Sequence, residues 1–374
     1  MYRNCRAKIA GVVGTTLLVI GGTVGMNGCV SGSVKQIQTS NELPPDLPPE
    51  LRKRFDYKEA ASLLKGSDEG LTAERALASD QQLDGRDSTR VGKSKKRKNK
   101  KLAGKFDTDT ANADKLSAVP FVYPTRRPAQ DPIWQAERLT YGISYLGVGA
   151  GELTMEVLPF KTMANRKVYH VRGNAVSSSV FSLFYSLNDV IESFIDYEGL
   201  FSHRFHLVLD ESKQKRDSLE LNDSEKQQTY YWDRVTRTEQ PLRETKKFSP
   251  IQPFSQDSIS ALYYLRTVPL TIGAIVTIPV VSEGNTWDAV CTVLRREVVG
   301  SPLGDISALV IKPEMKYQGV LKKSGDSFLW LTDDDRRIPL RLEAKVRIGY
   351  VVANLKRVEL GTPPATLAPS PSTK

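Results

Sequence analysis

The chain has 374 residues, enough for one or two domains with a sizeable hydrophobic core. It carries 53 Lys and Arg against 43 Asp and Glu, yet residues 131–360 hold equal numbers of basic and acidic side chains. Because the positive excess lies before residue 131 and at Lys374, the composition argues against a folded nucleic-acid-binding surface. The three cysteines, Cys5, Cys29 and Cys291, offer neither a disulfide framework nor zinc-ligand spacing.

The N-terminus has the pattern of an export signal. Arg3, Arg6 and Lys8 precede an apolar, Gly-rich run over residues 9–24. This run is about 16 residues long, whereas a membrane-spanning helix needs roughly 20. We therefore expect residues 1–28 to form a signal peptide, and an uncleaved membrane anchor is the alternative.

The stretch MNGC (26–29) resembles the lipobox of bacterial lipoproteins, in which a small residue precedes the cysteine that is acylated. Gly28 and Cys29 fit this pattern, while Met26 and Asn27 depart from it. The resemblance implies that Cys29 is a lipid attachment site, and a plain secreted protein is the alternative. Since Val30 rather than Asp follows the cysteine, the resemblance also implies sorting to the periplasmic face of the outer membrane.

Residues 29–130 are poor in aromatic and β-branched runs and rich in Lys, Asp, Ser and Pro. This composition predicts a disordered tether, long enough to hold a folded domain about 55 Å from a membrane on average. The stretches PELRKRFDYKEAASLLKG and SDEGLTAERALASDQQL each favour a helix. Neither has a partner in the sequence to bury against, so we expect both to be marginal.

The tether contains a block of eight basic residues with no acidic residue among them. Such a block indicates either a solvated chain or contact with an anionic envelope polymer or lipid headgroup. An exported protein rarely meets DNA, so we expect no nucleic-acid partner. The candidate residues for contact with an anionic surface are Lys93, Lys95, Lys96, Arg97, Lys98, Lys100, Lys101 and Lys105.

Residues 131–362 show short runs in which apolar and polar residues alternate, the pattern of half-buried strands. The clearest run, IPLRLEAKVRI (338–348), places six apolar residues on one face and four charged residues on the other. The Gly-rich GVGAG (147–151) predicts a bend or bulge rather than a phosphate cradle. We expect one mainly β, antiparallel domain, as a curved sheet, partial barrel or sandwich, with one or two short helices and a disordered tail at 363–374.

Two stretches interrupt the alternation. SQDSISALYYLRTV (255–268) predicts a helix with Asp257 or Ser258 as its N-cap, since Asp and Ser side chains accept hydrogen bonds from the first free N–H groups. SSSVFSLFYS (177–186) predicts a single helical turn.

Three consecutive acidic residues, Asp333, Asp334 and Asp335, follow the strand-like SFLWLT and precede IPLRLE. This position predicts a hairpin loop, where an Asp side chain caps nearby backbone N–H groups. Arg336 and Arg337 can balance the acidic charge. We interpret the aspartates as turn residues, and a metal-binding or catalytic cluster is the alternative.

Four stretches together resemble a bacterial envelope family known as domain of unknown function 3108. They are ERLTYGISYLGVGAGELTMEV, VFSLFYSLNDVIESF, QDSISALYYLRTVPL and LWLTDDDRRIPLRLEAKVRIGYVVANL. The resemblance covers about residues 131–360 and implies an exported, antiparallel β-rich fold with no established reaction. The lipobox and the basic tether lie outside the family pattern, so their roles do not follow from it.

The sequence contains no P-loop, HExxH, GxSxG or paired CxxC motif. His203 and His206 are three residues apart in a strand-like run and so project to opposite faces, which is poor geometry for one metal ion. We expect a non-catalytic protein without cofactor or metal. The alternative is a carboxylate-dependent hydrolase acting on an envelope glycan, because such an acid pair needs no local motif.

Two non-catalytic functions remain open. A carrier would hold a lipid or other apolar ligand between the sheet and the helix at 255–268. Asp189, Asp257 and Arg266 are the candidate ligand-binding residues for that function. An assembly factor would instead dock on an envelope protein or on peptidoglycan, with Cys29 as its membrane anchor.

Overall fold

The computed structural model describes residues 43–44, 46–59, 121–318, 320–321, 326–346 and 348–364. The predicted signal peptide, Cys29, the basic block and the tail from residue 365 lie outside these residues. The chain divides into two units, one of residues 1–60 and 124–374 and the other of residues 61–123. The first unit contains every helix and strand that the structure describes.

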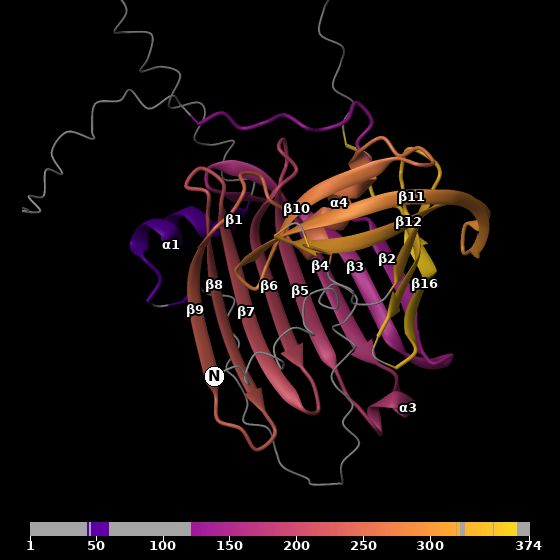
Figure 1. Cartoon of the computed structure of the whole chain (residues 1–374), viewed down its shortest axis with the longest axis horizontal. Helices are drawn as coiled ribbons and strands as arrows, with labels where there is room; N and C mark the ends of the chain where they lie inside the picture. Colours follow the sequence, from indigo (N-terminus) through magenta and orange to yellow (C-terminus); the bar gives the residue numbers. More distant parts are fainter. Residues whose placement is uncertain are drawn as a thin grey trace, which may run out of the picture. The chain divides into compact units, whose positions relative to one another are not determined.

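One antiparallel sheet of 16 strands organises this unit and confirms the predicted fold class (Figure 1). Its main path runs β10-β11-β12-β14-β15-β16-β2-β3-β4-β5-β6-β7-β8-β9, so the sheet is open, with β10 and β9 at its edges. Two short strands lie off the path: β1 pairs with β3, and β13 pairs with β12. The strands are β1 (Tyr57–Glu59), β2 (Arg138–Tyr145), β3 (Val148–Met163), β4 (Arg166–Ser177), β5 (Asn188–Asp196), β6 (Ser202–Asp210), β7 (Gln214–Asp223), β8 (Gln228–Arg237), β9 (Arg243–Pro250), β10 (Ile275–Ser282), β11 (Asn285–Ser301), β12 (Gly304–Tyr317), β13 (Val320–Leu321), β14 (Ser327–Thr332), β15 (Pro339–Lys345) and β16 (Tyr350–Glu359).

Helix α4 (Ser258–Thr267) covers one face of this curved sheet and contacts β5 and β10. Ile259 and Tyr263 are buried in a core with residues of β2–β6 and β16. Leu265 is buried in a second core, formed with β10–β12 and β14. The apolar side of the helix therefore joins two cores, and Figure 1 shows the helix beside the strands β10–β12 that cross one end of the sheet.

The bend predicted at GVGAG (147–151) forms as the sequence indicates, and the strand predicted over 338–348 forms in part. Gly147 adopts a positive φ of 79° between β2 and β3, a conformation that glycine tolerates without a Cβ clash. The register shifts between Ile143, which pairs with Gly151, and Ser144, which pairs with Gly149, so a bulge lies at Ala150 within the predicted bend. In β15 the predicted alternation holds for Leu340 and Ala344, but the strand ends at Lys345, and Ile348 is exposed.

Part of the predicted tether is ordered, which corrects the expectation for residues 46–59. Helix α1 (Pro49–Phe55) begins at paired prolines and buries Phe55 completely. Phe55 lies in a core with Phe194 and Leu219, and β1 extends the sheet by pairing Tyr57 with Met163. Because these partners lie more than a hundred residues further along the chain, the local sequence of the tether does not predict the contact.

Strand β9 is an edge strand for which the sequence carries no alternating signal. Four of its eight residues, Arg243, Glu244, Lys246 and Lys247, are charged, and most of the strand is exposed. Charges on an edge strand block further strand addition, so this composition is common at sheet edges although it is atypical of interior strands. Helix α3 (Ser179–Ser182), by contrast, occupies the predicted helical turn.

Candidate functional site

Asp257 acts as the N-cap of α4, as its sequence position predicts. Its Oδ1 accepts hydrogen bonds from the backbone N–H groups of Ile259 and Ser260 at 2.8 Å, and the Ser260 Oγ in turn accepts the Asp257 N–H. Its Oδ2 accepts the Ser193 hydroxyl at 2.7 Å. Burial raises the pKa of Asp257, and these hydrogen bonds oppose that rise. The side chain is fully engaged in joining α4 to β5.

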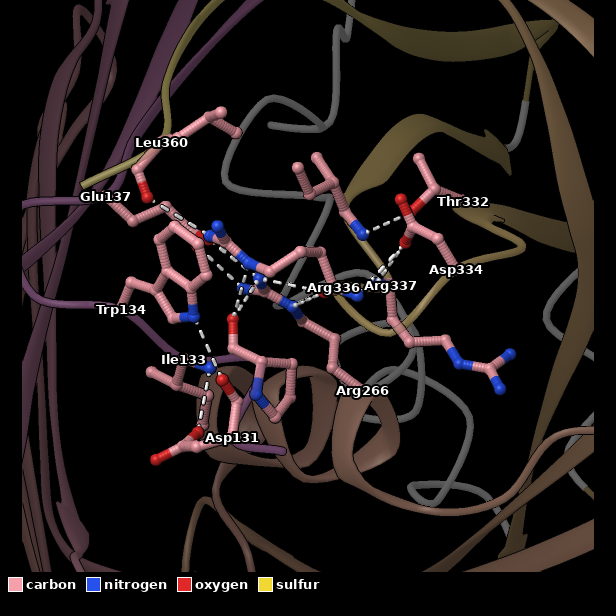
Figure 2. Close-up of polar contacts among 12 residues, drawn as sticks. Asp131, Ile133, Trp134, Glu137, Arg266, Thr332, Asp334, Arg336, Arg337 and Leu360 are labelled. Carbon is pink, nitrogen blue, oxygen red and sulfur yellow. Dashed lines mark hydrogen bonds and ion pairs between the residues drawn. The ribbon is translucent and has the colours of Figure 1, made fainter. Parts of the chain in front are cut away.

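Arg266 lies at the other end of α4, in a cluster that we call the arginine clasp (Glu137, Arg266 and Arg336) and that Figure 2 shows. Arg266 donates two parallel hydrogen bonds to the Glu137 carboxylate, at 2.7 and 2.8 Å, and both side chains are buried. Burial opposes the charge of Arg266, but the Glu137 carboxylate offsets this and holds its pKa above the ordinary value. Such a bidentate pair fixes geometry as well as charge.

Arg336 completes the clasp from the turn between β14 and β15. Its Nη2 donates to Glu137 Oε2 at 2.5 Å, and its guanidinium lies 3.5 Å from the centre of the Trp134 ring (Figure 2). Arg266 also donates to the Arg336 carbonyl oxygen. The clasp thus ties the chain before β2, the end of α4 and the β14–β15 turn to one another.

Of the three aspartates of that turn, Asp334 caps the backbone, as predicted. Asp334 Oδ1 accepts the N–H groups of Arg336 and Arg337 at 3.0 Å and the Thr332 hydroxyl at 2.5 Å (Figure 2). Asp333 pairs with Arg296 of β11. Among the described residues, no group of three or more His, Cys, Asp or Glu side chains is placed to hold a metal ion.

Asp189 is a buried acid at the start of β5. Its Oδ1 accepts the Asp210 N–H at 3.0 Å, while its Oδ2 is buried without a hydrogen-bond partner. Burial and the nearby Glu211 carboxyl raise the pKa of Asp189 to about 9. Burial also raises the pKa of Glu211, which accepts the Tyr185 hydroxyl at 2.8 Å. Asp189 is therefore neutral at pH 7.

The three candidate ligand-binding residues lie apart in the structure. Asp257 and Arg266 are at opposite ends of α4, about 13 Å apart at the helical rise per residue. Asp189 is separated by about 13 Å of strand from Ser193, the β5 partner of Asp257. Each engages a different part of the fold, so they do not converge on one ligand.

All three histidines are buried beside an acid. His170 lies 3.1 Å from Glu192, His203 lies 3.1 Å from Asp196, and His206 lies 2.7 Å from Asp217. Glu192 and His206 are direct cross-strand partners on β5 and β6. These pairs satisfy buried polar groups between strands, and the sequence alone offers no signal for them because the partners lie on different strands.

A cluster of exposed apolar side chains stands at the opposite end of the sheet from α1. It comes from three loops: the β2–β3 turn, the α3 loop between β4 and β5, and the β15–β16 turn. Leu183 and Phe184 are each 81% exposed. The loops touch, because the Ser178 N–H donates to the Ala150 carbonyl and the Leu146 N–H donates to the Tyr350 carbonyl. We call this surface the apolar tip; its members are Leu146, Val148, Val180, Leu183, Phe184 and Ile348.

From the sequence, the segments of the apolar tip are predicted only as a bend and a helical turn. A signal for it was available, since residues 173–188 contain no charged side chain although they connect two strands at the surface. An uncharged loop of this kind is unusual, because connecting segments normally carry polar side chains to water. Exposed apolar patches of this sort mark interaction surfaces.

None of the helices among the described residues combines the length and apolar character needed to cross a membrane. No curated protein matches the chain. A beta-barrel-like protein of domain of unknown function DUF1849 from Brucella abortus has a similar structure, with 11% identity and a TM-score of 0.39 over 61% of this chain and 99% of its own. A protein with a YmcC-like fold from Bacteroides fragilis, described as exported, shows 9% identity and a TM-score of 0.27 over 64% of this chain and 99% of its own. The family model for proteins of unknown function DUF3108 matches residues 139–356, more than half of the sequence, and the chain therefore belongs to this family.

Proposed function

We propose that the protein is a non-catalytic lipoprotein of the bacterial cell envelope that works as a docking module for envelope assembly. In this proposal Cys29 carries the lipid, the periplasmic face of the outer membrane is the site of anchoring, and the β domain engages a partner through its surface. The other non-catalytic function, a carrier that stores an apolar ligand inside the sheet, has less support.

The position of α4 is the observation that carries this choice. A carrier needs space between the helix and the sheet, whereas Ile259, Tyr263 and Leu265 are buried there against strand residues. The polar groups that could have oriented a ligand are engaged as well, Asp257 in the helix cap and Arg266 in the arginine clasp. Apolar residues on this face therefore act as core, and recognition falls to the outer surface.

The substitution Ala261→Trp tests this choice. Ala261 is half-buried on α4 and packs against the second core, so a larger side chain should overpack it and cost about 1–3 kcal/mol of unfolding free energy. Extracted envelope lipid should affect the thermal unfolding of the parent and of Ala261→Trp equally, because no lipid enters between α4 and the sheet. Val298→Trp, at an exposed position on β11, is the matched control. It should change neither the unfolding free energy nor the response of thermal unfolding to lipid.

A lipid-dependent rise in the parent's unfolding temperature, absent in Ala261→Trp, would favour the carrier. The glycan hydrolase alternative rests on the neighbouring acids Asp189 and Glu211, whose raised pKa values are typical of catalytic acids. Both side chains are buried, however, so a sugar cannot reach them in this conformation. Retention of envelope function in Asp189→Asn supports the docking module, and its loss supports the hydrolase.

A further inference from the structure

The most exposed part of the apolar tip is the loop that follows α3. Its two most exposed members, Leu183 and Phe184, follow α3 directly and point away from the loop's own core. Phe181 and Tyr185 of the same loop turn inward and pack with Ala175. The packing of the inward side chains thus fixes the position of the outward ones, and their exposure is a property of the fold.

The backbone N–H groups at the most exposed part of this loop are satisfied within it. The backbone N–H groups of residues 181–185 all donate: Phe181 to the Ser178 Oγ, and the next four to carbonyl oxygens of residues 178–181. The Ser178 hydroxyl donates to the Gly149 carbonyl, and the Ser182 hydroxyl donates to the Ser178 carbonyl. Backbone that enters lipid must be satisfied internally, and residues 181–185 meet this condition for their N–H groups.

The charge and the rim of the tip fit the same environment. No charged residue occurs in 145–151 or 173–188. At the rim, Lys345 lies 6.0 Å from the ring of Tyr350, and Tyr145 donates its hydroxyl to the Ile348 carbonyl at 3.0 Å. Lys and Tyr at the border of an apolar surface are characteristic of the membrane interface, where the apolar body enters the lipid and the polar end remains in water.

We propose that the apolar tip is a membrane-docking surface that inserts Leu183 and Phe184 into the interfacial region of a lipid bilayer. This inference rests on the proposed function and names its partner as lipid. The anchor allows it, because residues 30–42 span at most about 45 Å between Cys29 and Leu43. That reach is comparable to the roughly 40 Å length of β4, a strand of 12 residues that ends at the tip.

Tryptophan probes in the full-length chain test this proposal. Phe184→Trp places a probe in the tip, and Val298→Trp places one at a similarly exposed position on another hairpin. The chain is bound to vesicles of phosphatidylethanolamine and phosphatidylglycerol, with and without brominated acyl chains. The emission of the parent, which has four tryptophans, is subtracted as the common background.

We expect the Phe184→Trp emission to shift to shorter wavelength and to be quenched by brominated lipid, with neither effect in Val298→Trp. Adding Leu183→Ser to Phe184→Trp should weaken the quenching, because each buried apolar side chain of this size contributes roughly tenfold or more to partitioning. Unchanged thermal unfolding of these surface variants verifies the fold.

Co-flotation of the chain with vesicles reports the lipid anchor separately from the tip. If the chain floats with vesicles while the emission of Phe184→Trp stays as it is in water, the tip proposal is overturned and the lipid anchor is supported. A photo-crosslinker at position 184 that captures a single envelope protein in place of lipid also overturns it, in favour of a protein partner. Quenching at position 184 in a chain with Cys29→Ser would support the tip even if the anchor fails.

Discussion

Asp189 illustrates how one buried group contributes to the pH dependence of the protein's stability. Its folded-state pKa is raised to about 9, against 3.8 ordinarily, by burial and by Glu211. Between these values the unfolded chain releases a proton that the folded chain keeps, so stability falls as pH rises, by up to about 1.4 kcal/mol per pH unit. Asp189→Asn keeps the shape without the charge. We therefore expect this variant to gain stability over the parent from pH 4 to pH 9 in urea unfolding.

The matched control for this prediction is Asp196, whose environment has the opposite effect. Burial raises the pKa of Asp196, but hydrogen bonds from Arg166 and His203 outweigh it, so the net pKa is lowered. Its stabilisation is present above the ordinary pKa and is lost as pH falls through the lowered value. Asp196→Asn should hence lose stability at pH 7. A parent and an Asp189→Asn variant with parallel pH profiles would contradict the assignment.

At the scale of elements, helix α1 and strand β1 show how contacts with distant residues stabilise a structure that the local sequence favours only weakly. Phe55 is completely buried against β5 and β7. Phe55→Ala should cost about 3–5 kcal/mol in chemical unfolding, as other buried Phe truncations do. Lys53→Ala, exposed on the same helix, should stay within about 0.5 kcal/mol of the parent. Equal stability of the two variants would show that residues 49–55 belong to the tether and do not pack on the domain.

The first described residue of the unit, Leu43, redefines the spacer for the whole molecule. The predicted spacer ran for about a hundred residues, whereas residues 30–42 separate Cys29 from Leu43, the first buried residue that the structure describes. The basic block lies between β1 and β2 in the sequence, so it does not separate the domain from the anchor. In the proposal that Cys29 carries the lipid, the domain should therefore stay within about 45 Å of the membrane surface.

The anchor is tested at the same scale by Cys29→Ser, which should release the protein from the membrane fraction because a thiol for acylation is gone. Cys5→Ser is the matched control, since Cys5 lies within the predicted signal peptide and its loss should not alter anchoring. Membrane association that survives Cys29→Ser, with the N-terminus intact by mass spectrometry, would show an uncleaved anchor instead.

The sequence by itself determined the antiparallel β class, the Asp257 cap and the Asp334 turn. These features depend on residues within a few positions of one another, so alternation and turn chemistry are sufficient to predict them. Only the tertiary structure decided the partner of Arg266, which is Glu137, 129 residues away, and the burial of Phe55. The apolar tip arose in the same way, because three loops that are uncharged or nearly so become one surface only when antiparallel pairing brings their turns to the same end of the sheet.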